Sequence, residues 1–255
     1  MQVYFVGAGP GDPELITIKG KNAIENAGYC IYAGSLVNKD ILNYTKPGTK
    51  IYDSASMTLE EVLAVIKEAN DSDENVARLH TGDPSIYGAI QEQMQALDAM
   101  GIEHLIIPGV SSFTAAAASL KQELTLPGVS QTIIITRIKG KTSVPEKEDL
   151  QKLAQSNATL CIFLSIGKIE KVANDLSKDY GKNCPVAVVY KATWSDEKII
   201  RGTLENIGTK IKKSKIIKTA MIIIGRVLEK DFEVSQLYNK NFEHGCRKKK
   251  INTKP

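Results

Sequence analysis

The chain has 255 residues, 42% of them hydrophobic, which is enough to form one large or two modest domains with buried cores. Its formal charge is +4, but residues 231–255 hold six Lys or Arg against three Asp or Glu, and the remainder is nearly neutral. Such a body lacks the basic surface of a duplex-binding protein, and no stretch approaches the roughly 20 apolar residues of a membrane helix. We therefore expect a cytoplasmic protein that binds neither nucleic acid nor membrane.

The four cysteines, Cys30, Cys161, Cys184 and Cys246, are scattered along the chain without a C-x-x-C pair. This spacing indicates neither a zinc site nor a disulfide framework. We expect no metal site, and thiols that are buried or unreactive.

In the first half of the chain, hydrophobic periodicity predicts strands that alternate with helices. Strands are expected at residues 3–6, 29–33, 75–79 and 103–107, and helices at 16–26, 58–70, 86–100 and 114–120. Thr58 and Glu61 have the spacing of a capping box at the start of the second helix. This alternation is typical of a mainly parallel sheet with helical crossovers.

The second half repeats the pattern with stronger strand signals. Strands are expected at residues 132–136, 159–164, 186–190 and 220–224, and helices near 148–156, 168–179 and 204–213. The L-P-G turn at 126–128 is suited to a junction between domains. We predict an α/β protein with an N-terminal α/β domain (1–124), a C-terminal α/β domain (125–230) and a basic tail (231–255).

The first strand runs into G-A-G-P-G-D at residues 7–12, which superficially resembles a dinucleotide-binding loop. That loop follows G-x-G-x-x-G and places a pyrophosphate at a helix N-terminus. Here Asp12 replaces the third glycine, Pro10 removes a backbone donor, and no acid ends the second strand to hold a ribose. These departures argue against a nicotinamide site, although a reductase stays an alternative.

Three loops follow predicted strand ends, where parallel sheets bind their ligands. They are residues 7–12, T-G-D-P-S-I-Y-G at 81–88 and P-G-V-S-S at 108–112. Glycines let backbone approach a ligand closely. Taken singly, each loop also has a purely structural interpretation. The second fits an Asx-turn before a helix that starts near Ser85, and the third fits a strand-to-helix turn capped by serine. Taken together, the loops predict one cleft.

The combination of these three motifs resembles the tetrapyrrole methylase family, over about residues 2–249. Within that family, the segments at 32–37 and 135–146 and the tail at 237–248 resemble precorrin-4 and cobalt-precorrin-4 C(11)-methyltransferases. The resemblance implies two α/β domains with S-adenosylmethionine in the cleft between them, and a homodimer. It also implies methyl transfer to C-11 of precorrin-4 or its cobalt complex, in cobalamin biosynthesis.

Carried over motif by motif, the resemblance implies a set of residues that contact the cofactor: Gly82, Asp83, Ile86, Tyr87, Ser111, Ser112, Phe163, Leu164, Tyr190, Ala192, Thr219 and Ala220. For Phe163 and Leu164, an ordinary place in the core at a strand end is the alternative. Thr193 and Trp194, just beyond Tyr190, are expected to be core residues.

Methyl transfer from a sulfonium is an in-line displacement that positioning alone can promote, so no activated serine or cysteine is needed. The three histidines form no triad, and His80 is expected to be structural rather than ligand-binding. Asp12 is the candidate to assist removal of a proton from the acceptor, and capping of a helix is an equally good interpretation of it.

The tetrapyrrole substrate carries many carboxylates, which basic side chains can pair with. Arg137, Lys139 and Lys141 are the candidates, with a merely solvated loop as the alternative, and Gly9 and Pro10 are expected to line the acceptor. Other functions stay open: a sister methylase acting at another ring carbon or on ribosomal RNA, or a non-catalytic nucleotide-binding module. All three loops keep their glycines, which favours a working site.

Overall fold

The computed structural model describes residues 1–140, 142–229, 233–235, 239, 242–243 and 245–247, which form two compact units. The first unit contains Met1–Leu120, Val189–Ile199 and Ile217–Met221. The second contains Lys121–Val188, Ile200–Ile216 and the described residues from Ile222 onward. Two segments of the C-terminal half therefore fold with the N-terminal unit. The linear division of the chain near residue 125 stays a prediction.

The first unit is built on a five-stranded sheet in the order β3-β2-β4-β1-β5, and every adjacent pair is parallel. Its strands are β1 (Val3–Gly7), β2 (Tyr29–Tyr32), β3 (Lys50–Asp53), β4 (Val76–His80) and β5 (His104–Ile107). Strand β1 lies between β4 and β5. The carboxyl ends of these three strands, and the loops that follow them, are therefore neighbours.

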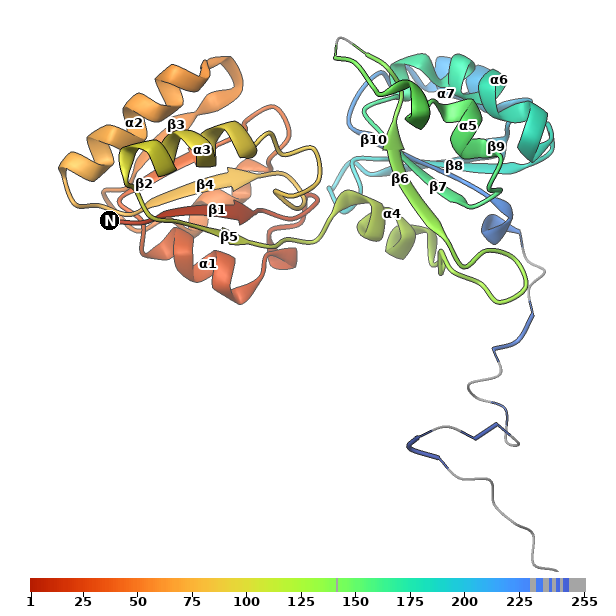
Figure 1. Ribbon diagram of the computed structural model, residues 1–255, viewed down its shortest axis with the longest axis horizontal. Coiled ribbons are helices and arrows are strands. Elements are labelled where there is room, and N and C mark those ends of the chain that lie inside the picture. Colours follow the sequence, from red (N-terminus) through yellow and green to blue (C-terminus); the bar gives the residue numbers. More distant parts are fainter. Residues whose placement is uncertain (141, 230–232, 236–238, 240–241, 244, 248–255) are drawn as a thin grey trace, which may run out of the picture. The chain divides into compact units, whose positions relative to one another are not determined.

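Helices cover both faces of this sheet (Figure 1). On one face lie α2 (Leu59–Asp71) and α3 (Gln91–Met100), whose Ile66 and Leu97 are buried in a core with Phe5. On the other lies α1 (Ile18–Glu25), which packs Ile24 near Val6. The alternation of Phe5 and Val6 between the two cores follows from the period of two along a strand.

Most of the predicted elements of this unit are present, and the capping box at the start of α2 is confirmed. The Thr58 side chain accepts from the Glu61 amide, and the Glu61 carboxylate accepts from the Thr58 amide. The helix expected from residue 86 begins at Gln91 instead. Tyr87 and Ala89 have φ of 56° and 49°, which no right-handed helix accommodates. The short strand β3 was missed because three of its four residues are exposed and it has no apolar alternation.

The second sheet has the order β6-β7-β10-β8-β9 and is mixed, because β6 runs parallel to β7 while β10 is antiparallel to β7. Its strands are β6 (Ile133–Arg137), β7 (Thr159–Phe163), β8 (Pro185–Tyr190), β9 (Lys198–Thr203) and β10 (Ala220–Ile224). The accompanying helices are α5 (Leu150–Ala154), α6 (Ile169–Tyr180) and α7 (Ile207–Ser214). Strand β9 was not predicted.

Cys30, Cys161 and Cys184 are buried free thiols, as expected, whereas Cys246 is exposed. In the described part of the chain, no helix combines the length and apolar character that a membrane span requires. Much of the predicted basic tail, including Lys248 to Lys250, lies outside the described residues.

Candidate active site

The three glycine-rich loops meet at the carboxyl edge of the first sheet. Gly9 and Gly82 form an antiparallel bridge, with the Gly82 amide donating to the Gly9 carbonyl at 2.7 Å and the reverse bond at 3.3 Å. The Ala8 amide donates to the His80 carbonyl at 2.8 Å. The convergence of the loops that follow β1 and β4, expected from the sequence, is therefore confirmed.

Crowded backbone explains why glycines stand at this edge. A methyl group on Gly109 would overlap the Gly82 carbonyl oxygen and the Gly7 Cα atom, and a methyl group on Gly7 would overlap Gly109. Gly82 itself has a φ of 64°, in the region that favours glycine. The third loop thus joins the other two by direct backbone packing.

The Asp83 carboxylate ties the second loop to the third. Its Oδ2 accepts from the Gly109 amide at 2.9 Å, and its Oδ1 accepts from the Ser85 amide at 2.8 Å and from the Ser85 hydroxyl. Burial opposes ionisation of Asp83, but the bonds from Ser85 and Gly109 outweigh it and lower its pKa. The predicted Asx-turn is present, although no helix begins near Ser85.

Buried polar side chains form hydrogen bonds with the backbone at the end of the second loop. Arg78 donates to the Gln93 side chain at 3.2 Å, and Gln93 donates in turn to the Ala89 carbonyl at 2.8 Å. His80 is 5% exposed, and its Nε2 has no hydrogen-bond partner. Burial and the Arg78 charge, partly offset by a hydrogen bond with the Gly88 backbone, lower the His80 pKa to about 3. His80 is therefore a neutral structural histidine.

The opening loop fixes Asp12 at the start of a short 3-10 helix, Pro13–Leu15. The Asp12 Oδ1 accepts from the Glu14 amide at 2.9 Å, so the predicted capping role is confirmed. Asn38 donates to the Gly11 carbonyl at 2.9 Å. Among the described residues, none donates a hydrogen bond to Asp12 Oδ2, so this carboxylate oxygen can make other contacts.

Left-handed backbone conformations occur in several of the segments predicted to bind the cofactor. Four non-glycine residues there have positive φ, namely Tyr87 (56°), Leu164 (52°), Lys191 (47°) and Thr219 (55°), and Thr193 (71°) directly follows one of these segments. Such conformations cost of order 1–3 kcal/mol and concentrate at functional sites. Positive φ also occurs outside these segments, at Asp73, Ala89, Lys121, Asn157 and Lys215. Lys215 lies at a helix C-cap, where this conformation is common.

Two of the predicted segments from the second half of the chain lie together in the first unit. The Lys191 amide donates to the Thr219 carbonyl at 2.9 Å, which joins the segment containing Tyr190 and Ala192 to the one containing Thr219 and Ala220. Phe163 and Leu164 belong to the second unit, at the end of β7. Leu164 is 70% exposed, so it is not the core residue that the alternative interpretation expected.

The predicted basic residues have different environments. Arg137 donates to the carbonyls of Thr142, at 3.4 Å, and Ser143, at 2.6 Å, so its guanidinium binds its own loop. Lys139 is exposed. Lys141 lies outside the described residues.

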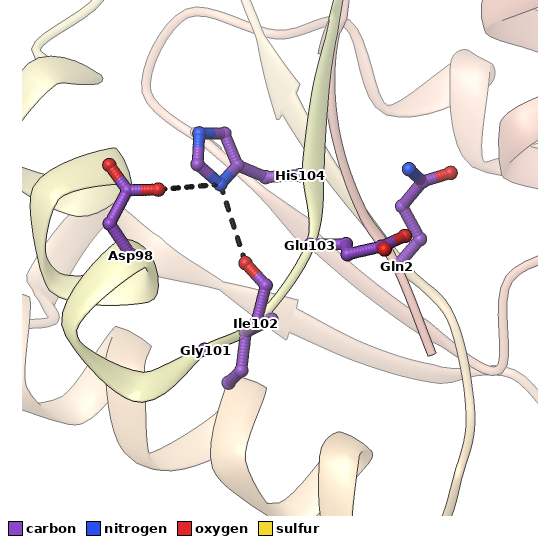
Figure 2. Close-up of a pocket in the computed structure, with 6 residues that line it drawn as sticks. All are labelled: Gln2, Asp98, Gly101, Ile102, Glu103 and His104. Carbon is purple, nitrogen blue, oxygen red and sulfur yellow. Dashed lines mark hydrogen bonds and ion pairs between the residues drawn. The ribbon is translucent and has the colours of Figure 1, made fainter.

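A separate hollow lies at the opposite, amino-terminal edge of the first sheet (Figure 2). It has a volume of about 350 Å³ and is lined by Gln2, Asp98, Gly101, Ile102, Glu103 and His104. His104 Nδ1 lies 3.8 Å from Asp98 Oδ1 and 3.4 Å from the Ile102 carbonyl oxygen, and the Asp98 side chain is 72% exposed. The described residues contain no group of three His, Cys, Asp or Glu side chains suited to a metal ion.

Sequence reasoning missed Thr193 and Trp194, which contact the opening loop. Trp194 Nε1 donates to the Pro10 carbonyl at 2.9 Å, and Thr193 Oγ1 accepts from the Asp12 amide at 3.0 Å. These contacts span more than 180 residues of sequence, so no local pattern signalled them.

Comparison with known proteins places the chain in one family. The sequence model of the tetrapyrrole (corrin/porphyrin) methylases matches residues 2–208. A cobalt-precorrin-4 C(11)-methyltransferase of Methanocaldococcus jannaschii is 58% identical, covering 97% of this chain and 96% of that protein. A precorrin-4 C(11)-methyltransferase of Rhodococcus erythropolis is 45% identical, covering 94% and 97%.

A solved structure agrees with the sequence matches. The X-ray structure of a cobalamin biosynthetic enzyme, cobalt precorrin-4 methyltransferase, matches with a TM-score of 0.87 and 43% identity over 89% of this chain and 96% of that one. A uroporphyrin-III C-methyltransferase from Thermus thermophilus, complexed with S-adenosylhomocysteine, matches with a TM-score of 0.75 and 27% identity, covering 90% and 94%. The chain therefore belongs to the tetrapyrrole (corrin/porphyrin) methylase family.

Proposed function

We propose that this chain transfers a methyl group from S-adenosylmethionine to C-11 of precorrin-4 or cobalt-precorrin-4, in cobalamin biosynthesis. The observation that carries the proposal is the edge at which three glycine loops meet, bridged by Gly9 and Gly82 and tied by Asp83. The relatives that match nearly the whole chain bear the names of this activity.

The residues at this edge fit a donor that has an amino-acid end and an adenosine end. Helix α4 (Ser112–Leu120) starts directly after the third loop, and its first amides have no partners within the helix. They suit a carboxylate, as helix N-termini generally do. We infer that Gly82, Asp83, Ile86, Tyr87, Ser111 and Ser112 hold the methionine part. Asp83 does so by fixing the loops, because its own oxygens are occupied.

For the adenosine end, we infer contacts from Phe163, Leu164, Tyr190, Ala192, Thr219 and Ala220. The exposure of Leu164 supports this assignment. Its apolar side chain is 70% exposed on backbone with positive φ, so its burial beneath a bound adenosine would be favourable. When bound, S-adenosylmethionine supplies an electrophilic methyl group. Catalysis then rests on how the chain orients donor and acceptor, since such a displacement needs little acid or base assistance.

On the acceptor side, we infer that Gly9 and Pro10 line the tetrapyrrole and that Asp12 helps to remove a proton after methylation. Asp12 suits this role because the Glu14 amide holds one of its oxygens and the other has no described donor. Lys139 and Lys141 are proposed to pair with substrate carboxylates. Arg137 is proposed to act by shaping their loop, because its guanidinium holds the Thr142 and Ser143 carbonyls.

A mass measurement tests the reaction. Purified protein incubated with S-adenosylmethionine and cobalt-precorrin-4 should yield a product heavier by one methyl group, placed at C-11 by NMR with a labelled donor. A methyl group at another carbon would favour a sister activity instead. The observation that favours this second candidate is a uroporphyrinogen-III C-methyltransferase of Bacillus subtilis, which is 33% identical over 89% of this chain and 48% of that protein.

Donor binding is tested separately by calorimetry with S-adenosylhomocysteine. Leu164→Ala should weaken binding about tenfold while leaving the melting temperature unchanged, since this side chain is already exposed. Met100→Ala is the matched control, because Met100 is 45% exposed and ends α3 at the opposite edge. Equal affinities of the two variants would contradict the assignment of Leu164.

We further infer a homodimer, for which the family resemblance is the only support, and a cytoplasmic location, which rests on the sequence. Light scattering at several protein concentrations tests the assembly. A monomeric mass throughout would reject the dimer and leave the proposed chemistry standing.

A further inference from the structure

Trp194 lies directly on the opening loop, although more than 180 residues separate them. Its Nε1 donates to the Pro10 carbonyl at 2.9 Å. A methyl group on Gly11 would overlap the indole ring, so the indole occupies the space of a side chain at that position. Both residues belong to the first unit. Packing of Trp194 is therefore sufficient to explain the glycine at position 11.

The neighbouring Thr193 holds the next residue of the loop. Its Oγ1 accepts from the Asp12 amide at 3.0 Å. Pro10 and Pro13 have no amide hydrogens, so the Asp12 amide is one of the few donors with which this loop can be anchored. Together, the two contacts fix the backbone on both sides of Gly11. They thereby set the direction in which the Asp12 carboxylate projects.

The segment that carries these two side chains is itself held by further hydrogen bonds. Thr193 has a φ of 71°, a strained value for a β-branched residue, which surrounding contacts must maintain. Glu197 supplies them, because its Oε2 accepts from the Thr193 amide and from the Ser119 hydroxyl, each at 2.7 Å. This anchor connects the segment to helix α4.

A charged group also contacts the indole ring of Trp194. The Lys191 ammonium lies 4.9 Å from the Trp194 ring centre, in cation–π geometry, and pairs with the Asp196 carboxylate at 2.7 Å. Trp194 is thus in contact with Gly11 and with Lys191. Hydrogen bonds, a ring contact and an ion pair therefore all hold this segment against the opening loop or beside it.

We propose that Thr193 and Trp194 are positioning residues that orient Asp12 toward the methyl acceptor. This inference rests on the proposed function, and specifically on the part that Asp12 takes in it. The proposed donor site consists of other residues, so loss of these contacts should lower turnover without weakening donor binding. A purely structural role would instead lower stability and leave turnover per folded molecule unchanged.

Matched variants at one position give the sharpest test. Thr193→Val keeps the shape of the side chain but removes the acceptor for the Asp12 amide, whereas Thr193→Ser keeps that acceptor. We expect kcat for Thr193→Val to fall about tenfold, with S-adenosylhomocysteine affinity within about twofold of the unmodified chain. Thr193→Ser should restore kcat to within about twofold.

Trp194→Phe tests the second contact, because it keeps an aromatic ring on Gly11 but removes the donor to Pro10. A similar fall in kcat is expected. Tyr180→Phe is the control, since it removes one buried bond from an aromatic side chain to a carbonyl, that of Ala158, in the second unit. If Thr193→Val and Trp194→Phe turn over like Tyr180→Phe, the inference is overturned.

A measurement that needs no activity separates this inference from the proposed function. Hydrogen exchange of the Asp12 amide, followed by NMR, should be slow in the unmodified chain and at least about tenfold faster in Thr193→Val. Failure of the unmodified chain to methylate any precorrin would reject the proposed function. An Asp12 amide that exchanges equally fast in both proteins would reject the positioning role, whatever the reaction.

Discussion

The two edges of the first sheet differ in how their backbone is used. The amino-terminal edge has the hollow of about 350 Å³, but it is lined by an ordinary turn, with Asp98 largely exposed. The carboxyl edge brings together crowded glycines, the Asp83 tie and nearby left-handed backbone. Backbone crowding and the Asp83 tie therefore distinguish the candidate site from the hollow.

The largest difference between the two edges is expected when one methyl group is added at each. Gly109→Ala forces Cβ onto the Gly82 carbonyl, so we expect a loss of about 3 kcal/mol in unfolding free energy and of S-adenosylhomocysteine binding. Gly101→Ala, at the other edge, has open space and only its φ of 68° to oppose it. It should cost about 1 kcal/mol and leave binding intact. Urea unfolding and calorimetry measure both; equal effects would erase the distinction.

A smaller effect is expected from Asp83→Asn, which puts an amide group where the Gly109 and Ser85 donors need an acceptor. We expect a loss of about 2 kcal/mol at pH 7 together with weaker binding. Because the pKa of Asp83 is lowered in the folded chain, this contribution is present above the ordinary carboxyl pKa, and it is lost as the pH falls through the lowered value. The stability gap between the two proteins should therefore close below about pH 4. A gap that persists in acid would show that the carboxylate's charge is not involved.

His80 should make the stability of the chain depend on pH, because the folded state disfavours its charged form, whereas it favours the charged form of Asp83. Its pKa is lowered to about 3, so the unfolded chain takes up a proton below about pH 6.5 that the folded chain refuses. The free energy of unfolding should therefore decrease as the pH is lowered from about 6.5 towards 3, by about 1.4 kcal/mol per pH unit at most. His80→Gln should remove that slope from urea unfolding measured at pH 7, 6 and 5. Parallel slopes would mean that His80 is protonated in the folded protein.

The smallest effect is expected at the amino-terminal edge. Asp98→Asn removes a largely exposed charge that lies 3.8 Å from His104, a geometry that contributes little. Unfolding free energy should change by less than about 0.5 kcal/mol, and S-adenosylhomocysteine affinity should not change. A marked loss of affinity would move the candidate site to the hollow of Figure 2.

The strand ends and the motifs were predictable because each depends on a few consecutive residues. The period of two in β1 and the capping box of α2 are local patterns, and both are present. The late start of α3 was not predictable in the same way. In residues 86–90, Tyr87 and Ala89 have left-handed backbone, the buried Gln93 side chain bonds the Ala89 carbonyl, and His80 bonds the Gly88 backbone.

By itself, the sequence determined the α/β class, the three glycine loops and the family, since periodicity and short motifs are properties of neighbouring residues. The tertiary structure decided what those glycines and acids do. Gly11 makes room for Trp194, Asp83 ties two loops together, and Thr193 anchors the Asp12 amide. Each of these contacts joins residues far apart in the chain, and only the folded backbone brings them within hydrogen-bonding distance.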